Sequence, residues 1–258
     1  MTQEQRLHEI KQMLERQNHL ITRDLAKHFN ISFDTARRDV IQLVSTGQAI
    51  RVHGGLISNT DDEGLPFLTR TQIDSPIKTK MAQMAQHFIH SKQCDFIGPS
   101  TTLKKLCQLI SGTNLQIVTN SIDNSLELMR SEFPEILLLG GKVNKEHRFN
   151  YSVSALDSLK RISFNNAFVG TANVKSDGIY LPKINDAELI KVATSRAKRI
   201  IVVAEKHKFN NSKVAPYMAV PLDQIDVLIT DEPLSDQLKQ NFAPTTRIIS
   251  VLKKQIDA

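Results

Sequence analysis

A short segment near the N-terminus carries polar side chains at a spacing that suits contact with a nucleic acid. On a helical wheel, the apolar residues Ala36, Val40 and Leu43 share one face of a helix. The opposite face carries Asp34, Thr35, Arg38 and Gln42, with Arg37 at its margin. Arginine and glutamine hydrogen-bond base edges in the major groove of DNA, and arginine also binds phosphate. The spacing predicts a DNA-reading helix, in which Arg38 contacts a base edge and Arg37 either contacts phosphate or shares the base contact with Arg38.

The residues around this helix predict a helix-turn-helix followed by a β-hairpin wing. An amphipathic helix carrying Leu7, Ile10 and Leu14 comes first. Thr22 is the predicted N-cap of a second helix and Ser32 that of the third. Gly54-Gly55 permits the positive φ angles of a tight hairpin. The predicted DNA-contacting residues are Thr22, Ser32, Phe33, Asp34, Thr35, Arg37, Arg38, Gln42, Arg51, His53 and Gly54.

One residue breaks the pattern, and the charge distribution leaves a simpler interpretation open. Ile41 does not fit a polar outer face, and we expect it to contact another part of this module. Residues 1–57 hold eight Lys and Arg against six Asp and Glu, a net charge of +2, so the +6 of the whole chain is not concentrated there. A charged outer face of a helix can be merely solvated.

Composition excludes several classes of protein. The chain has 258 residues, 40% hydrophobic and 23% charged, which is typical of a globular protein. We find no apolar run long enough for a membrane helix and no signal peptide, so we expect a cytoplasmic protein without membrane contact. The two cysteines, Cys94 and Cys107, cannot build a disulfide framework or a cysteine-based zinc site. No cofactor, metal site or catalytic residue is predicted.

The remainder of the chain predicts an α/β domain with a mostly parallel sheet. Short apolar runs at 94–97, 115–118, 136–139, 167–169, 200–204, 227–229 and 248–251 alternate with helical stretches at 101–111, 121–131, 153–161, 186–196 and 234–242. Residues 58–75 are rich in Ser, Asn, Asp, Gly and Pro and are interpreted as a linker. The predicted domains are therefore 1–57, which binds DNA, and 76–258, which senses an effector and assembles an oligomer.

Loops at the carboxyl ends of the predicted strands favour an anionic ligand. Residues 98–102 lie between a strand and the N-terminus of a helix, where backbone N–H groups suit a phosphate. In an open α/β sheet, ligands bind at those strand ends. Lys191 or Lys208 would supply part of the countercharge. The predicted effector-binding residues are Gly98, Ser100, Thr101, Thr102, Thr119, Asn120, Gly140, Gly141, Lys142, Asn173, Glu188, Lys191 and Lys208.

The chain resembles the DeoR family of bacterial transcriptional repressors. Residues 31–40, Gly47 and residues 51–55 match the family's recognition helix and wing, with Ala36 where Ile or Val is usual. The resemblance extends over nearly residues 3–252, but Ser100 and Ser152 stand where the family has glycine. The form of residues 98–102 is most similar to repressors of lactose and tagatose phosphate utilisation. DeoR-type sensor domains resemble ribose-5-phosphate isomerase and related sugar-phosphate enzymes.

The resemblance implies a repressor of a carbohydrate-utilisation operon that binds double-stranded operator DNA and responds to a phosphorylated sugar. Because helix-turn-helix proteins read paired half-sites, we expect a homo-oligomer, either a dimer or a tetramer. An enzyme of the sugar-phosphate isomerase type with an accessory N-terminal domain is the main alternative. A protein-interaction adaptor is a third interpretation, and it would show no salt-sensitive binding of DNA.

Overall fold

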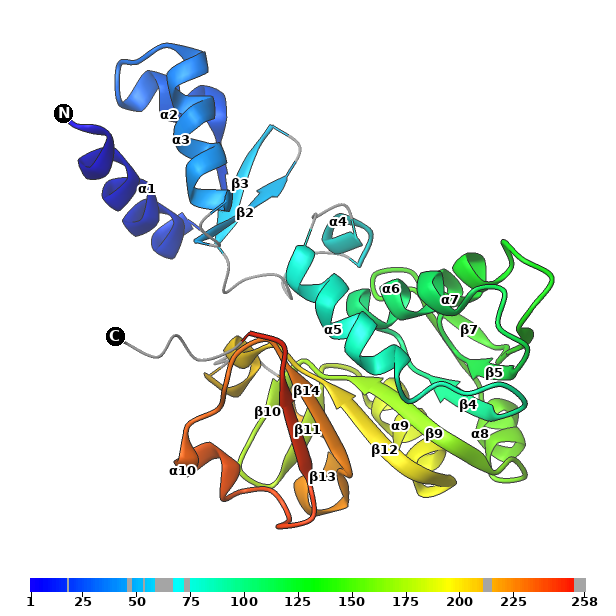
Figure 1. Ribbon diagram of the computed structural model, residues 1–258. Coiled ribbons are helices and arrows are strands. Elements are labelled where there is room, and N and C mark those ends of the chain that lie inside the picture. The colour runs from blue at the N-terminus through cyan, green and yellow to red at the C-terminus, as the bar shows by residue number, and fades with distance from the viewer. Residues whose placement is uncertain are drawn as a thin grey trace. The chain divides into compact units, whose positions relative to one another are not determined.

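A computed structural model describes residues 1–17, 19–45, 48–52, 54–58, 67–71, 75–210 and 215–252. The chain divides into two compact units, Met1–Asp74 and Ser75–Ala258 (Figure 1). The predicted fold class is confirmed: the first unit is a winged helix-turn-helix and the second is an α/β domain with a parallel sheet. Each unit is described separately below.

The first unit packs three helices against a small antiparallel sheet. Its elements are α1 (Gln3–Gln17), β1 (His19–Ile21), α2 (Thr22–His28), α3 (Phe33–Ser45), β2 (Ala49–Val52), β3 (Gly55–Ser58) and α4 (Phe67–Thr71). The three strands lie in the order β1-β3-β2. Apolar residues of the helices and the sheet form one core, which includes Ile10, Leu14, Leu25, Val40, Leu43 and Leu56. Burying each of these large side chains stabilises the unit by about 1.5–3 kcal/mol.

The hairpin of the wing uses its two glycines for different purposes. Gly54 has a φ of +83°, the left-handed conformation that a two-residue turn needs and that glycine adopts easily. A Cβ on Gly55 would lie 2.0 Å from the carbonyl oxygen of Leu20, because β3 pairs closely with β1 there. The prediction that both glycines serve the turn is therefore correct only for Gly54. The strand β1 was not predicted.

Two further predictions for the first unit need correction. Thr22 is the first residue of α2 rather than its N-cap; Ile21 occupies the N-cap position, and no side chain caps this helix. Residues 58–75 were interpreted as a linker, but Ser58 ends β3 and Phe67–Thr71 form α4. Phe67 is buried, and the Arg70 guanidinium lies 5.3 Å from the centre of its ring. Apolar burial thus organises a segment whose composition suggested a loop.

The second unit is built around a seven-stranded parallel sheet in the order β15-β14-β12-β9-β4-β5-β6. Along the chain these strands are β4 (Cys94–Ile97), β5 (Gln116–Thr119), β6 (Glu135–Leu138), β9 (Phe164–Gly170), β12 (Ala197–Val203), β14 (Val227–Thr230) and β15 (Arg247–Ser250). All seven coincide, within a few residues, with the predicted apolar runs. The chain order reverses between β4 and β9, so the topological switch point lies there.

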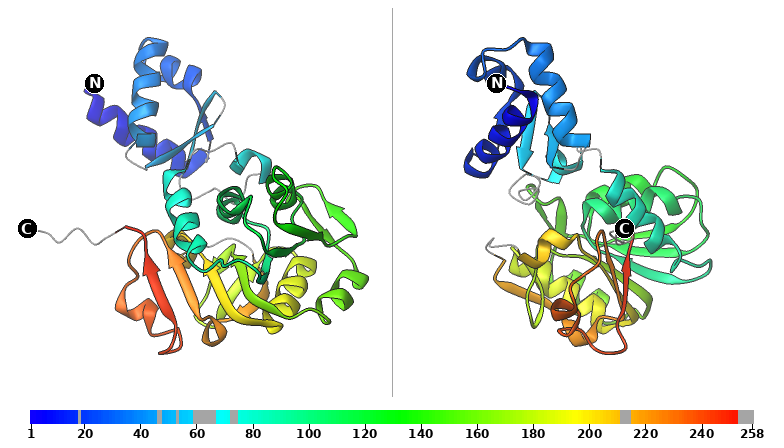
Figure 2. Two further views of the ribbon diagram at one scale, coloured as in Figure 1. Left: turned by 45° about the vertical axis from the view of Figure 1, so that its right-hand side comes forward. Right: turned by 60° about the vertical axis from the view of Figure 1, so that its left-hand side comes forward.

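Helices cover both faces of this sheet, as a parallel sheet requires (Figure 2). The helices are α5 (Pro76–Gln86), α6 (Thr101–Ile110), α7 (Ile122–Leu128), α8 (Val153–Leu159), α9 (Ile184–Ser195) and α10 (Asp236–Lys239). Residues of α5, α6 and α7 pack on one face and residues of α8 and α9 on the other. Serine side chains N-cap five of them, at Ser75, Ser100, Ser121, Ser152 and Ser235.

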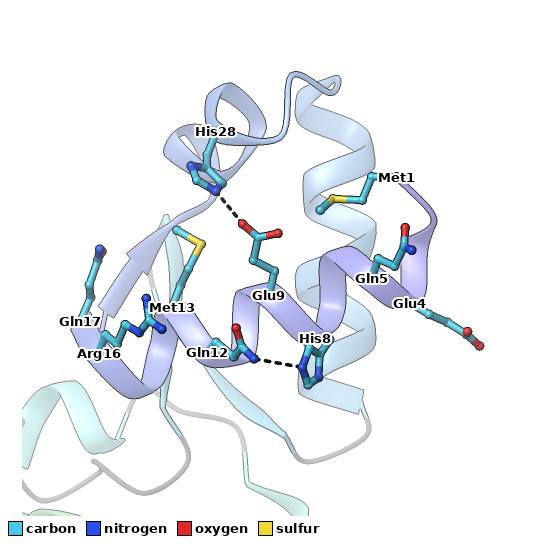
Figure 3. Close-up of a pocket in the computed structure, with 10 residues that line it drawn as sticks. All are labelled: Met1, Glu4, Gln5, His8, Glu9, Gln12, Met13, Arg16, Gln17 and His28. Atoms are coloured by element: carbon cyan, nitrogen blue, oxygen red, sulfur yellow. Dashed lines mark hydrogen bonds and ion pairs between the residues drawn. The ribbon is translucent and has the colours of Figure 1, made fainter.

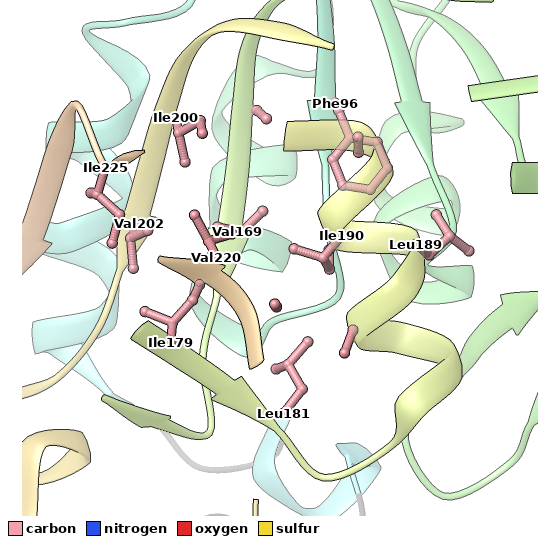
Figure 4. Packing of buried hydrophobic residues seen from close by; sticks show 14 of the residues in the cluster. Phe96, Val169, Ile179, Leu181, Leu189, Ile190, Ile200, Val202, Val220 and Ile225 are labelled. Atoms are coloured by element: carbon pink, nitrogen blue, oxygen red, sulfur yellow. The ribbon is translucent and has the colours of Figure 1, made fainter. Parts of the chain in front are cut away.

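The sequence did not predict a second, smaller sheet that closes the core beside α9. It consists of β10 (Asn173–Val174), β11 (Gly178–Leu181) and β13 (Tyr217–Pro221), all antiparallel. Figure 4 shows its residues Ile179, Leu181 and Val220 packed together with Ile190 of α9 and Val202 of β12. A hairpin of β7 (Lys142–Asn144) and β8 (Phe149–Tyr151) was also missed. Such strands of two to five residues are too short to show an alternating pattern.

Candidate functional site

The outward face of α3 carries the residues that the helical wheel selected. Asp34, Arg37, Arg38 and Gln42 are all exposed, and Thr35 is half-buried. Phe33, at the start of the helix, is also exposed. Ile41 was expected to contact another part of the module, and this is wrong: its side chain is exposed on the same face. An apolar group beside two arginines suits a base edge, where the methyl group of thymine offers an apolar contact.

The turn before α3 holds the helix start as predicted. The Ser32 hydroxyl accepts a hydrogen bond from the Thr35 backbone N–H at 3.2 Å, and the two side-chain oxygens lie 2.9 Å apart. This is the N-cap arrangement, which fixes the first turn of a helix. Asn30 turns the chain between α2 and α3 with a φ of +50°. The cap therefore sets the direction in which α3 presents its N-terminal residues.

A buried ion pair that the sequence analysis missed fixes α3 against α1. Asp39 has no exposed area, and its carboxylate accepts hydrogen bonds from Arg6 Nε at 2.7 Å and Arg6 Nη2 at 3.2 Å. Gln3 Nε2 donates to the same carboxylate at 3.0 Å. A bidentate arginine–carboxylate pair has a defined geometry as well as a favourable energy. Arg6 lies 33 positions before Asp39, so no local spacing could reveal the pair.

Two basic residues of α2 extend the polar surface beyond α3. Arg23 and Lys27 are exposed, four positions apart on one face of α2. They line a shallow hollow at the turn, together with Asn30, Ile31 and Phe33. In a helix-turn-helix the first helix of the motif crosses the phosphate backbone. The sequence analysis did not select Arg23 and Lys27, although their spacing was a signal that could have found them.

The remaining predicted DNA contacts differ in their accessibility. Arg51 is exposed on β2, and Gly54 is exposed at the hairpin turn. His53 lies outside the described residues. Thr22 is only 7% exposed, and its backbone N–H donates to the Gly54 carbonyl at 2.9 Å. The structure therefore gives Thr22 a place in the packing between α2 and the wing.

A second hollow in the first unit lies on α1 and α2 (Figure 3). His28 Nε2 lies 3.1 Å from Glu9 Oε1, and Gln12 Nε2 lies 3.0 Å from His8 Nε2. Most of its lining belongs to α1, and none of the lining residues belongs to α3. The His28–Glu9 contact joins α2 to α1 on a surface that the DNA-contact prediction does not involve.

In the second unit, the predicted phosphate loop lies at the switch point of the sheet. Gly98 N donates to the Phe168 carbonyl at 2.9 Å, so the loop after β4 is bonded to β9. A Cβ on Gly170 would lie 2.8 Å from Ser100 Cβ. The Ser100 hydroxyl accepts from Thr102 N at 3.2 Å and from Leu103 N at 3.5 Å. The serine that replaces a family glycine thus already occupies two N–H groups at the start of α6.

The loop after β5 is held mainly by hydrogen bonds within the protein. Thr119 is fully buried, and its hydroxyl donates to the Ile97 carbonyl at 2.6 Å. Asn124, on the first turns of α7, donates to the Gly98 carbonyl at 3.0 Å. These bonds tie the ends of β4 and β5 together. The hydroxyl of Thr119, which was predicted to bind effector, therefore holds these two loops together. Thr101 and Thr102 are also buried.

A buried carboxylate that was not selected lies beside these loops. Asp186, in the first turn of α9, is 8% exposed and accepts a hydrogen bond from Asn120 Nδ2 at 3.3 Å. Burial raises the pKa of Asp186 to about 7, and the Asn120 bond opposes this rise. The Oδ1 atoms of Asn120 and Asn150 are buried without a hydrogen-bond partner. These oxygens accept hydrogen bonds, so they suit a ligand that supplies hydroxyl donors.

The Gly-Gly loop after β6 is joined to the β7–β8 hairpin. Gly141 has a φ of +137°, and a Cβ there would lie 2.2 Å from the Tyr151 carbonyl oxygen. Ser152 Oγ donates to the Gly140 carbonyl at 3.0 Å. Tyr151 in turn donates its hydroxyl to Glu188 Oε2 at 2.8 Å, which raises the pKa of the tyrosine. This bond joins Glu188 to the hairpin. The side chains of Glu188, Lys142 and Lys191 are all exposed.

The loop after β12 combines a buried lysine with a link to α5. Lys208, in the 3-10 helix η2 (Lys206–Asn210), is buried, and its backbone N–H donates to the Glu205 carbonyl at 2.9 Å. The Glu205 carboxylate lies 3.5 Å from Lys78 Nζ, and Lys78 is itself buried in the first turn of α5. Asn173, which begins β10, is buried too, and β10 packs against η2. The Lys78–Glu205 pair was not predicted.

Two other kinds of feature are absent from the described residues, a metal-binding cluster and a membrane-spanning helix. The described residues contain no group of three or more His, Cys, Asp or Glu side chains that could hold a metal ion. None of their helices is long and apolar enough to cross a membrane. Cys94 and Cys107 are free thiols, and burial raises the pKa of both.

Comparison with known families agrees with this two-part architecture. Residues 6–62 match the DeoR-like helix-turn-helix domain, and residues 74–232 match the DeoR C terminal sensor domain. The chain belongs to the DeoR family. Both halves of a DeoR-type regulator are therefore present in it, and the resemblance stated from the sequence is confirmed. The protein is a DNA-binding transcriptional regulator, and the isomerase alternative is not supported.

Two curated relatives cover almost the whole length of this DeoR-family protein. It is 31% identical to the HTH-type transcriptional repressor GlcR of Bacillus subtilis (strain 168), covering 90% of this chain and 89% of that protein. It is 28% identical to the lactose phosphotransferase system repressor of Lactococcus lactis subsp. lactis, covering 96% and 99%. These identities do not single out the lactose and tagatose subgroup.

A solved structure, ribose 5 phosphate isomerase A from Neisseria gonorrhoeae, resembles about half of the DeoR-family chain. The identity is 15%, the match covers 52% of each chain and the TM-score is 0.38. A likeness at this level says nothing about activity.

Proposed function

We propose that this protein represses a carbohydrate-utilisation operon by binding double-stranded operator DNA through α3, and that a phosphorylated sugar controls this binding. In this proposal residues 1–57 bind DNA, and residues 76–258 bind the sugar and assemble a homo-oligomer. The observation that carries the proposal is the exposed face of α3, on which Arg38 and Gln42 stand beside Ile41. Such a face, mounted rigidly by the Arg6–Asp39 pair, suits entry into the major groove.

The residues of this surface divide into two roles. Arg38, with Asp34, Ile41 and Gln42, faces the bases. Arg37, Arg51, Arg23 and Lys27, together with the capped start of α3, face phosphates. Base contacts give sequence preference, whereas phosphate contacts give affinity for every sequence and a dependence on salt. Phosphate contacts alone would therefore make a sequence-independent binder.

The test is the affinity of the full chain for a duplex that it selects from a random-sequence library. Arg38→Ala should weaken binding to the selected duplex by about 1–3 kcal/mol and reduce its preference over unrelated duplexes. Arg37→Ala should weaken all duplexes more evenly. Arg16→Ala, an exposed arginine on α1, is the matched control and should change neither quantity. Equal affinity of wild type and Arg38→Ala for the selected duplex would refute the assigned role of α3.

We place the sugar-phosphate site at the carboxyl ends of β4, β5, β6 and β12, around the switch point. Residues 98–102 lie where a phosphate finds backbone N–H groups. In this proposal the countercharge comes from Lys142, which follows β6, Lys191 of α9 and Lys208, which follows β12. Asp186 and Asn120 offer acceptors for sugar hydroxyls. Differential affinity of the sugar for DNA-competent and DNA-incompetent arrangements would release the operator.

Thermal unfolding in the presence of pentose and hexose phosphates tests this site, because a specific ligand raises the melting temperature by mass action. The effective compound should lose its effect in Asp186→Ala but keep it in Asp157→Ala, an exposed carboxylate on α8. A melting temperature unchanged by the whole panel would remove the sugar-phosphate proposal.

We also infer that the chain is not an enzyme and acts in the cytoplasm. Its relatives are named as regulators of transcription. Incubation of the chain with the same sugar phosphates should give no isomerised product. Turnover of any of them would restore the isomerase alternative.

A further inference from the structure

β6 is an edge strand of the parallel sheet that leaves leucines exposed on both of its faces. Leu137 and Leu138 are 48% and 39% exposed. Successive side chains of a strand point to opposite faces of the sheet. Neither face is therefore fully covered at this edge. Within the described residues, β6 pairs with β5 on one side only.

Other exposed apolar side chains surround this strand. Six of the eleven large exposed hydrophobic residues that the structure describes from Ser75 to Leu252 fall between residues 126 and 143. They are Leu126 and Met129 at the end of α7, Phe133 before β6, Leu137 and Leu138 of β6, and Val143 of β7. α7 packs against β6. We call these six residues the β6 edge patch. Exposed apolar groups gathered in this way mark an interaction surface.

The opposite edge of the same sheet is different. On β15, Ile248, Ile249 and Ser250 are half-buried, and the exposed Arg247 lies over the ring of Phe88 at 6.0 Å. Charged side chains and short strands keep sheet edges from pairing with other chains. Each edge strand begins with an exposed charged residue, Arg247 in β15 and Glu135 in β6. The following residues of β15 are half-buried, whereas Leu137 and Leu138 of β6 are exposed, so of these two edges β6 is the one that leaves apolar side chains open to a partner.

We propose that two copies of this chain pair through β6, antiparallel, around a two-fold axis at Leu137. The proposal builds on the homo-oligomer of the proposed function and names the surface that forms it. Glu135 N and Leu139 N donate to carbonyls on the β5 side, at 3.0 Å and 2.8 Å. Because backbone groups of alternate residues point to opposite sides of a strand, Ile136 and Leu138 direct theirs to the open edge.

The alternation of backbone groups along β6 fixes the register of the two paired strands. An antiparallel partner exchanges two hydrogen bonds between residues whose backbone groups both face the edge. Ile136 of one copy then bonds Leu138 of the second copy, and the reverse. Leu137 lies opposite Leu137 of the second copy in the intervening non-hydrogen-bonded position, where side chains are closest.

The charges that flank β6 fit a second copy in this orientation. Glu132 and Glu135 stand at the start of the strand, and Lys142 and Lys145 follow its end; all four are exposed. Antiparallel pairing brings the acidic end of one strand beside the basic end of the other. Parallel pairing would bring like charges together. Opposite charges across an interface favour the correct partner and orientation. The surface is therefore complementary to itself.

Cysteine cross-linking tests the register directly in the full chain. In a Cys94→Ser background, Leu137→Cys places two thiols opposite each other across the axis. Mild oxidation should convert most of the protein into a disulfide-linked dimer on a non-reducing gel. Glu135→Cys is the matched control: its thiol lies opposite residue 139 of the second copy and should give little dimer. Cross-linking of the two variants to the same extent would overturn the register.

Sedimentation separates failure of this surface from failure of the oligomer. Wild type should sediment as a dimer or tetramer, and Leu137→Glu should shift it to a smaller species at the same concentration. Val153→Glu, at an exposed apolar site on α8, should leave the assembly unchanged. Circular dichroism melting of each variant shows that it is folded. A Leu137→Glu variant that keeps the wild-type assembly overturns the β6 surface alone. A monomeric wild type overturns the oligomer as well.

Discussion

The predicted functional residues of the two units differ in their exposure to solvent. In the first unit, Arg37, Arg38 and Gln42 lie exposed on α3, on a frame of buried contacts that the prediction did not include. In the second unit, Thr119 and Asn120 are fully buried, and their side chains bond the protein itself. A DNA surface must project outward, whereas a small-ligand site is built from loops that brace one another. The first is therefore easier to recognise from a helical wheel.

Among the predictions made here, loss of the Arg6–Asp39 ion pair should have the largest effect on the stability of the first unit. Asp39→Ala removes the carboxylate that accepts from Arg6 and Gln3 and should destabilise the first unit by about 1.5–3 kcal/mol, because hydrogen bonds to a charged group are lost. Unfolding by denaturant, followed by amide hydrogen exchange in each unit, measures this effect. Asp34→Ala, at an exposed carboxylate on the same helix, should change stability by less than about 0.5 kcal/mol. Similar losses in the two variants would contradict a structural role for the pair.

In the second unit, the buried carboxylate of Asp186 should make the stability of the protein depend on pH. Because burial raises the pKa of Asp186 from 3.8 to about 7, the folded state holds this proton more tightly than the unfolded state. Stability from this group is therefore present at low pH and is lost as pH rises from about 4 to 7. Asp186→Asn cannot ionise and avoids this loss.

The difference in melting temperature between Asp186→Asn and wild type measures this effect. Between pH 5 and pH 8 the melting temperature of wild type should fall relative to that of Asp186→Asn. The fall corresponds to a loss of stability on the order of 2 kcal/mol. Asp95, whose pKa burial raises to about 6, titrates in both proteins and cancels in the difference. A difference that does not change with pH would show that Asp186 is ionised throughout.

The smallest of these effects concerns the serine at the start of α6. Ser100→Gly frees the N–H groups of Thr102 and Leu103 that the hydroxyl now accepts from. Glycine is a tolerable N-cap, so stability should fall by only a few tenths of a kcal/mol. The concentration of sugar phosphate that releases DNA should fall several-fold. Ser235→Gly, at the start of α10, is the control. An unchanged release concentration would place the phosphate away from α6.

Local patterns in the sequence were sufficient for most elements of the fold. The seven parallel strands are apolar runs, and the five inner ones are largely buried. Ser32, Ser75 and Ser100 mark helix starts by hydrogen bonds within three residues. Contacts between distant residues were not predictable. β1 exists because His19–Ile21 pairs with Ile57–Gly55, and Asp39 is buried because Arg6 reaches it.

The proposed sugar-phosphate site illustrates the same limit at the level of single side chains. Spacing placed Thr119 and Asn120 at the end of a strand, where ligands bind, and that location is correct. It could not tell that the Thr119 hydroxyl points to the Ile97 carbonyl. Nor could it single out Asp186, whose importance comes from burial and from Asn120, 66 positions earlier. On α3 this problem did not arise, because the residues that face solvent follow from the helical period alone.

The most direct test of the account is the affinity of the full chain for its selected duplex, measured by fluorescence anisotropy at fixed salt with and without the effective sugar phosphate. Wild type should bind tightly, and the sugar phosphate should weaken binding at least tenfold. Arg38→Ala should bind weakly in both conditions, and Asp186→Ala should bind tightly in both. The same affinity for all three proteins, with and without the sugar phosphate, would contradict both the reading surface on α3 and its control by the sheet unit.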